Sequence, residues 1–88
     1  MDNYSITTTK RFLRHLRKLD HNIKERVLDA IQEISENPRA GSALVHGERK
    51  LNKFRVGDHR LIYEIDDAAR TVTFIIVDHR RRVYRDLT

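Results

Sequence analysis

The stretch KFRVGDHRLIYEI, residues 53–65, decides the fold, because it contains two strands and the turn that joins them. A two-residue loop that begins with glycine is typical of a type II′ turn, so Gly57 and Asp58 are predicted to form that loop. In the resulting register Arg55 lies opposite Arg60. A longer loop would shift the register and separate the two arginines.

The predicted hairpin has two chemically different faces, because side chains alternate along a strand. The apolar face carries Phe54, Val56, Leu61, Tyr63 and Ile65. The opposite face, the cationic face, carries Lys53, Arg55, Arg60, Ile62 and Glu64. Like charges placed opposite each other repel, and Glu64 is the one acid in this pattern. The cationic face is either an ordinary solvated surface or a surface that binds phosphates.

Further strands and helices surround the hairpin. Strands are predicted at about 50–56, 59–66 and 71–78, and NYSIT at 3–7 predicts a short N-terminal strand. Apolar residues at helical spacing predict two successive helices before residue 38. Thr8 or Thr9 is expected to cap the first helix, and Asn22 the second. The segment RAGSALVHGER, residues 39–49, is expected to be an exposed connection.

This order of elements predicts an α+β fold. An N-terminal strand is followed by a two-helix hairpin that packs on one face of an antiparallel sheet, in the order βααβββ. Asn37 and Pro38 are expected to end the second helix, because a residue before proline avoids the helical conformation. The length of 88 residues suits a single domain spanning residues 1–88.

The composition argues against a disulfide-bonded, metal-binding, membrane or secreted protein. The chain has no cysteine, so neither disulfides nor thiolate metal sites are expected. Histidines lack the spacing of a metal-ligand pair, and His79 is the histidine considered for acid–base chemistry. The longest apolar stretch, FIIV at 74–77, is too short to cross a membrane, and no secretory signal is visible. A cytoplasmic protein is therefore expected.

The charge distribution favours a polyanionic partner. Lysine and arginine number 18 against 13 acids, which gives a net charge of +5. The cations are segregated into residues 10–18 and 80–85, where no acid occurs. RNA or ribosome contacts are predicted for Lys10, Arg14, Arg17, Lys18, Arg49, Lys50, Arg81 and Arg82. For the first helix, a solvated face is an equally good interpretation. Tyr84 stands among arginines, where it either stacks on an unpaired base or packs on the sheet.

Two segments together resemble the RelE/ParE toxin superfamily, and RelE-type toxins most of all. They are LNKFRVGDHRLIYEI at 51–65 and VDHRRRVY at 77–84, and the order of elements extends the resemblance over nearly the whole chain. The chain departs from the family pattern at Asn52, His59 and Asp78, where an aromatic residue, a tyrosine and a glycine are frequent. A C-terminal helix of the kind that some members carry is not expected.

The resemblance implies a RelE-like fold and the toxin of a type II toxin–antitoxin system. The implied activity is a ribosome-dependent mRNA endoribonuclease, which inhibits translation by cleaving mRNA in the ribosomal A site without metal or cofactor. Implied partners are a RelB-like cognate antitoxin, the ribosome and mRNA, with no membrane. The toxin is then either a monomer or part of a toxin–antitoxin hetero-oligomer. Alternatives are a ParE-like inhibitor of DNA gyrase and a non-catalytic RNA-binding module.

The resemblance also implies a catalytic set, in which a ribose 2′-hydroxyl attacks the adjacent phosphate. By matching positions, the set is Lys53, Arg55, Arg60, Arg80 and Tyr84. Arg60 and Arg80 would clamp the phosphate, because a planar guanidinium suits bidentate contacts. Lys53 is the expected base, because neighbouring cations disfavour its charged form. Arg55 would support the developing charge, and Tyr84 would orient the 2′-hydroxyl or stack on a base.

Overall fold

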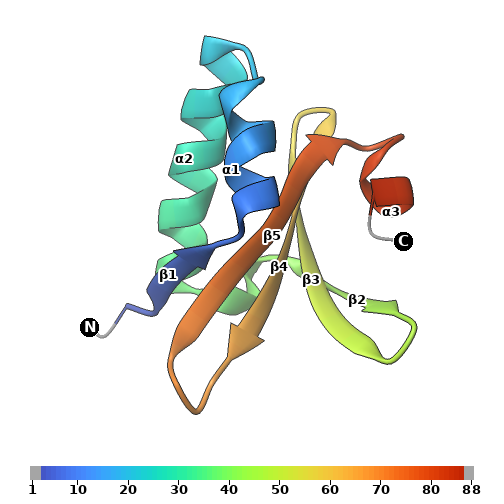
Figure 1. Ribbon diagram of the computed structural model, residues 1–88. Helices are drawn as coiled ribbons and strands as arrows, with labels where there is room; N and C mark the ends of the chain where they lie inside the picture. The colour runs from blue at the N-terminus through green and yellow to red at the C-terminus, as the bar shows by residue number, and fades with distance from the viewer. Residues whose placement is uncertain (1–2, 87–88) are drawn as a thin grey trace.

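The computed structural model describes residues 3–86, except for the side chains of Tyr84 and Asp86. Its elements follow in the order β1 (Ser5–Thr8), α1 (Lys10–Arg17), α2 (His21–Glu36), the 3-10 turn η1 (Pro38–Ala40), β2 (Ser42–His46), β3 (Arg49–Val56), β4 (His59–Asp66), β5 (Thr71–His79) and α3 (Val83–Asp86). The predicted α+β class is confirmed, with one strand and two helices before the remaining strands (Figure 1).

The sheet has five strands in the order β1-β5-β4-β3-β2. Strands β3 to β5 form the predicted antiparallel meander, and β2 extends it by one antiparallel strand. Strand β1 pairs with β5 in the parallel direction, from Ser5 opposite Thr71 to Thr8 opposite Phe74. The N-terminal strand therefore lies beside the last strand, although the two are far apart in the sequence.

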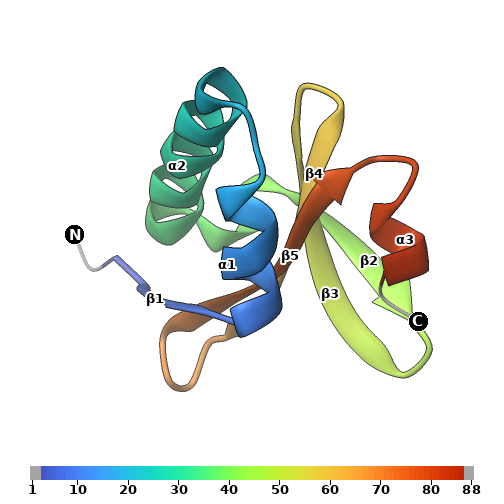
Figure 2. The same cartoon turned by 45° about the horizontal axis from the view of Figure 1, so that its top comes forward.

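The expectation that residues 39–49 form an exposed connection is wrong, because Ser42–His46 is the edge strand β2. It pairs with the first half of β3, and the resulting hairpin reaches away from the helices (Figure 2). Its side chains alternate weakly: Leu44 is half-buried, while Val45 is 71% exposed. An edge strand with so little buried surface carries almost no signal in its sequence.

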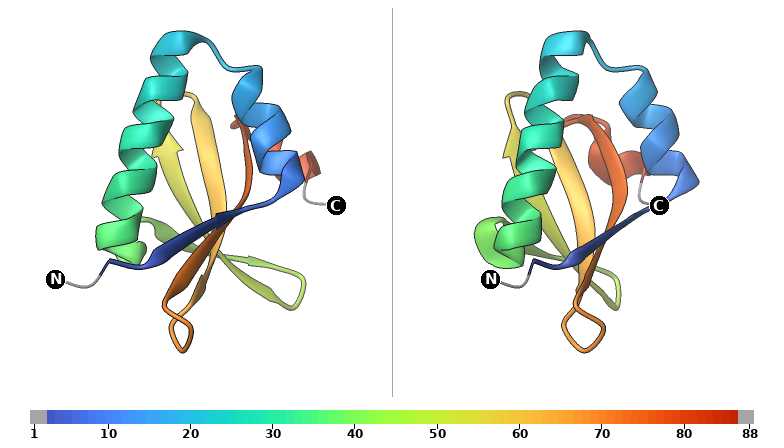
Figure 3. Two further views of the ribbon diagram at one scale, coloured as in Figure 1. Left: turned by 60° about the vertical axis from the view of Figure 1, so that its left-hand side comes forward. Right: turned by 90° about the vertical axis from the view of Figure 1, so that its left-hand side faces the viewer.

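The helical hairpin covers one face of the sheet, and α3 lies on the other (Figure 3). Side chains of α1 and α2 pack on the predicted apolar face to form the core: Phe12, Val27, Ala30 and Ile34 meet Val56, Leu61, Tyr63, Val72, Phe74 and Val77. Phe54 and Ile65 border this core and are partly buried. The assignment of these side chains to the helix-covered face is therefore confirmed.

The starts of the two helices differ in their caps. Thr9 caps α1 as predicted, because its Oγ1 accepts a hydrogen bond from the backbone N of Phe12 at 3.0 Å. The prediction of Asn22 as the cap of α2 is wrong: α2 begins at His21, with Asp20 in the capping position. Asp20 makes no side-chain capping bond, so the α2 start is weakly specified by sequence. The predicted end of α2 at Asn37 is confirmed.

The tight turn at Gly57 sets the register of the central hairpin as predicted. Gly57 has a φ of +60°, in the left-handed region required at the first loop position of a type II′ turn. Val56 pairs with His59, and Arg55 pairs with Arg60. The two arginines consequently project from the same face of adjacent strands.

A bulge in β5 breaks the alternation of that strand. Tyr63 of β4 pairs with Phe74, but the preceding Ile62 pairs with Ile76, so Ile75 is an extra residue. The carbonyl of Ile75 accepts a hydrogen bond of 2.7 Å from Oγ1 of Thr9, the same hydroxyl that caps α1. The start of α1 is thus tied to the bulge. From Ile76 onward, β5 turns the opposite set of side chains toward the helices.

The second face of the sheet has a small apolar cluster of its own. Val83 of α3 is fully buried there against Leu51, Ile62 and Ile76. This contact holds the single turn of α3 after the end of β5. Because Val83 is buried on this face, residues 80–82 must lead the chain from the end of β5 back to the sheet.

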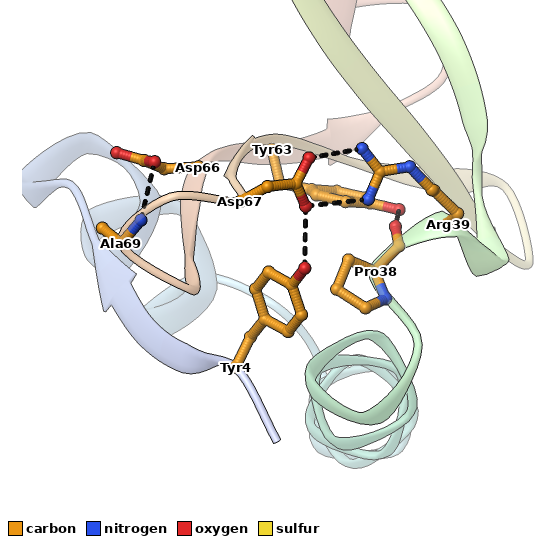
Figure 4. A network of polar contacts seen from close by, with 7 residues as sticks. All are labelled: Tyr4, Pro38, Arg39, Tyr63, Asp66, Asp67 and Ala69. Atoms are coloured by element: carbon orange, nitrogen blue, oxygen red, sulfur yellow. Dashed lines mark hydrogen bonds and ion pairs between the residues drawn. The ribbon is translucent and has the colours of Figure 1, made fainter. Parts of the chain in front are cut away.

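A polar network ties the N-terminal segment to the β4–β5 loop (Figure 4). Arg39 contacts both carboxylate oxygens of Asp67, at 3.0 and 2.8 Å, and the Tyr4 hydroxyl donates to the same carboxylate at 2.7 Å. The guanidinium of Arg70 lies 4.5 Å from the centre of the Tyr4 ring. The hydrogen bonds from Arg39 and Tyr4 lower the pKa of Asp67 from 3.8 to about 2.

This network predicts an acid-sensitive contribution to stability. Because the pKa of Asp67 is lower in the folded protein, the contribution is fully present above about pH 4 and is lost as pH falls toward 2. The Asp67→Asn variant should melt at a lower temperature than the wild type near neutral pH, and the difference should shrink toward pH 2. Thermal melts followed by circular dichroism over this pH range measure it. Asp66→Asn is the matched control, and equal pH profiles for wild type and Asp67→Asn would contradict the assignment.

Candidate functional site

The cationic face is centred on the arginine pair of the β3–β4 hairpin. Arg55 is exposed and Arg60 is half-buried, and they lie directly opposite each other. Nε of Arg55 donates to the carbonyl of Gly57 at 3.0 Å, and this bond holds the Arg55 side chain beside the turn. Lys53 is half-buried opposite Ile62, and it lies two residues before Arg55, on the same face of the sheet. The hairpin therefore presents three of the predicted site residues together.

An acid that the sequence pattern does not place on this face lies next to the arginines. Asp78 of β5 is directly opposite Arg60, so Glu64 is not the one acid there. Its carboxylate oxygen Oδ1 lies 3.2 Å from Nε and 3.1 Å from Nη2 of Arg82. The side chain of Asp78 is 17% exposed. The repulsion among the cations is thus partly compensated within the protein.

The segment after β5 folds back as a hydrogen-bonded turn. The backbone N of Arg80 donates to the carbonyl of Asp58 at 2.8 Å, which places Arg80 beside the turn that precedes Arg60. The backbone N of Arg82 donates to the carbonyl of His79, also at 2.8 Å. Arg80, Arg81 and Arg82 all have exposed side chains. The structure therefore brings the backbone of the predicted Arg80 to the end of the sheet where Arg60 lies.

Tyr84, the remaining member of the predicted catalytic set, is in α3. Its side chain lies outside the part of the chain that the structure describes. Its neighbour Val83 is anchored on the second face of the sheet, the face that also carries Lys53 and Arg60. The backbone of Tyr84 is consequently on the same side of the sheet as the cationic face.

The other predicted RNA contacts fall in two groups. Lys10, Arg14, Arg17 and Lys18 are all exposed on α1 or at its end. Lys50 is also exposed, while Arg49 forms an ion pair with Glu64 across the hairpin. Lys18 lines the same cavity as Asp78 and Arg82, so the end of α1 lies close to the turn after β5.

Two histidines lie on the helix side at the same end of the sheet. The rings of His59 and His79 are 5.8 Å apart and meet edge to face. Burial, followed by the nearby His79, lowers the pKa of His59, which is therefore neutral at pH 7. Its Nδ1 is buried and meets no hydrogen-bond partner among the described residues. His59 thus adds no charge to the neighbouring arginines.

A cavity of about 350 Å³ opens beside these histidines, between the end of α1, the start of β4 and the end of β5. Leu19, Ile23 and Val77 form its apolar wall. The polar side chains that line it are His15, Lys18, Asp20, His59, Asp78 and Arg82. Nδ1 of His15 lies 3.1 Å from the carbonyl of Val77, so this nitrogen is the donor. That bond satisfies part of the edge of β5 that β1 leaves uncovered.

No helix in residues 3–86 is long and apolar enough to cross a membrane. Within the same residues, no three histidine, aspartate or glutamate side chains are grouped so that they could hold a metal ion.

The chain is similar to known toxins over nearly its full length. A family model described as the ParE toxin of type II toxin-antitoxin system, parDE, matches residues 6–84. Toxin RelG of Mycobacterium tuberculosis is 36% identical over 83 residues, which cover 88% of this chain and 95% of that toxin.

Solved structures extend the similarity to three dimensions. The toxin-antitoxin complex RelBE2 from Mycobacterium tuberculosis matches with a TM-score of 0.81 and 35% identity, over 91% of this chain and 94% of that chain. The intact E. coli RelBE toxin-antitoxin complex matches with a TM-score of 0.75 and 26% identity, over 86% of this chain and 95% of that chain. The aligned regions are long enough to include the strands that carry the cationic face.

Proposed function

The chain belongs to the RelE/ParE family of toxins from type II toxin–antitoxin systems, and from that premise we propose that it is a ribosome-dependent mRNA endoribonuclease. It would inhibit translation by cleaving mRNA in the ribosomal A site. The observation that carries this proposal is the pairing of Arg55 with Arg60 on one strand face, at the end of the sheet where the backbone of Arg80 is bound to Asp58. Closely spaced guanidinium groups on a rigid sheet suit a phosphodiester.

The proposed reaction is attack of a ribose 2′-hydroxyl on the adjacent phosphate, with departure of the 5′-oxygen. Arg60 and Arg80 would bind the phosphate oxygens, where charge accumulates in the transition state. Lys53 would take the proton from the 2′-hydroxyl. Arg55 would support the charge or assist the leaving group, and Tyr84 would orient the 2′-hydroxyl or stack on a base. The sheet would hold these groups in place before the RNA binds.

The proposed partners follow from the family and from the charge distribution. A RelB-like antitoxin would form a hetero-oligomer with the toxin, because the related structures from Mycobacterium tuberculosis and E. coli are toxin-antitoxin complexes. The chain would act as one domain in the cytoplasm, without a metal or organic cofactor. The exposed cations of α1, together with Lys50 and Arg81, would contact ribosomal RNA. Such contacts would weaken with rising salt.

Mapping of mRNA 5′ ends after a brief pulse of expression tests the proposal. New ends are expected within translated reading frames soon after induction, together with an immediate stop in protein synthesis. A frame-matched mRNA with a mutated start codon is the control, and it should remain intact because no ribosome presents it. Intact mRNA in growth-arrested cells would contradict the proposal.

A ParE-like inhibitor of DNA gyrase is the second candidate, because the matching family model is that of the ParE toxin. This activity requires neither the paired arginines nor a basic strand face for RNA. The same pulse experiment separates the two candidates: a gyrase inhibitor would induce the DNA-damage response before protein synthesis falls. Intact mRNA accompanied by that response would favour this second function.

A further inference from the structure

Asp78 is a second acid on the cationic face, beside Glu64, and the bulge at Ile75 places it opposite Arg60. Without the extra residue, continuing the pairs from Tyr63 and Phe74 would set Arg60 opposite Val77. With it, Arg60 lies opposite Asp78. The carboxylate therefore occupies the position on β5 that is nearest in register to the arginine proposed to clamp the phosphate.

The carboxylate of Asp78 has two different kinds of contact. Its Oδ1 accepts a hydrogen bond of 2.7 Å from the backbone N of His79, which shapes the turn after β5. The same oxygen is in contact with Nε and Nη2 of Arg82. An asparagine could make the first contact equally well, because its side-chain oxygen is also an acceptor. The negative charge itself acts on the arginines.

We infer that Asp78 is a specificity-determining residue, whose carboxylate competes with an RNA phosphate for Arg82 and for Arg60 of the cationic face. A carboxylate and a phosphate offer a guanidinium the same kind of charged oxygen acceptors. A phosphate that approaches Arg82 or Arg60 must displace Asp78 or bind beside its negative charge. Free RNA is therefore bound weakly, and cleavage is reserved for RNA that the ribosome holds in place. This inference rests on the proposed function.

The Asp78→Asn variant tests the inference, because it removes the charge and keeps the acceptor. The probe is a short fluorescent single-stranded RNA with 2′-O-methyl riboses, which lacks the attacking hydroxyl. At low salt the variant should bind this RNA about three- to tenfold more tightly than the wild type, as expected for loss of one nearby like charge. The gain should shrink as salt is raised, because screening weakens the repulsion. The variant should also cleave unmodified free RNA faster than the wild type.

Two controls separate competition from a general effect of charge or folding. Asp66→Asn removes the same charge at the far end of the β4–β5 hairpin, where Asp66 accepts a hydrogen bond from the backbone N of Ala69. This variant should leave RNA binding unchanged. In an Arg82→Gln background, Asp78→Asn should give a smaller gain, because the guanidinium that Asp78 contacts is gone.

The outcomes distinguish this inference from the proposed function. Equal RNA affinities of wild type and a folded Asp78→Asn variant, with ribosome-dependent cleavage intact, would overturn the inference and leave the function standing. Equal gains from Asp78→Asn and Asp66→Asn would also overturn it, since the effect would be one of net charge. Absence of RNA binding and cleavage by every variant would overturn both.

Discussion

Alanine in place of Arg60 is expected to leave the domain folded and to lower cleavage of translated mRNA by about a hundredfold or more. Loss of a single preorganised group that stabilises transition-state charge typically costs a factor of this order. Arg60 is half-buried on β4 and lies between Arg55 and Asp78 in the register of the sheet. The Arg80→Ala variant should lose activity to a similar extent.

Cleavage in a reconstituted translation reaction measures the effect directly. Lysine at position 60 should rescue little activity, because an ammonium cannot make the bidentate contact of a guanidinium. Lys24→Ala is the matched control: Lys24 is a cation of α2 that is half-buried like Arg60, and it belongs to none of the groups proposed to contact RNA. Wild-type cleavage by folded Arg60→Ala and Arg80→Ala variants would refute the assignment of the site.

Alanine in place of Gly41 should be the most destabilising small substitution in the chain. A Cβ built at Gly41 would lie 2.2 Å from the backbone oxygen of Lys53 and 2.6 Å from the hydroxyl of Tyr63. The first neighbour is strand backbone, and Tyr63 is fully buried with its hydroxyl donating to the carbonyl of Pro38 at 2.8 Å. Neither can move without disturbing the pairing of β2 with β3 or the core.

The expected cost of Gly41→Ala is about 2–3 kcal/mol in the free energy of unfolding, or on the order of 10–20 °C in melting temperature for a domain of this size. Thermal and urea denaturation of the purified protein measure it. Ser42→Ala changes the exposed neighbouring residue and should melt like the wild type. An unchanged melting temperature for Gly41→Ala would mean that β2 does not begin against Tyr63.

The parts of the fold that could be predicted from sequence are those fixed by local chemistry. The glycine of the β3–β4 turn determines which residues face each other, so the register of Arg55 and Arg60 was accessible without a structure. The two helices could be predicted from sequence because their apolar residues repeat at the helical period. Asn22 was misassigned as a cap because a capping residue one or two positions earlier fits the same apolar stripe.

The parts that could not be predicted depend on contacts between distant segments. Strand β2 is defined by its hydrogen bonds to β3, and its own side chains are mostly exposed. The position of Asp78 depends on the bulge at Ile75, where the extra residue is accommodated by a hydrogen bond from Thr9, far earlier in the chain. A count of alternating residues along β5 would put Asp78 on the wrong face. The sequence therefore predicts the cations of the candidate site but not the presence of Asp78 beside them.

The position of β5 between β1 and β4 has a consequence for the newly made polypeptide. Strand β1 and helices α1 and α2 are translated early. Strand β5, with which β1 pairs, is translated near the end. Until residues 71–79 leave the ribosome, Phe12 and Val27 have no complete surface to pack against. Prematurely released chains that stop before β5 should remain unfolded and be degraded by cellular proteases. Since Arg80 and Tyr84 follow β5, a chain released just after residue 79 would contain every strand of the sheet but would lack these two members of the proposed site.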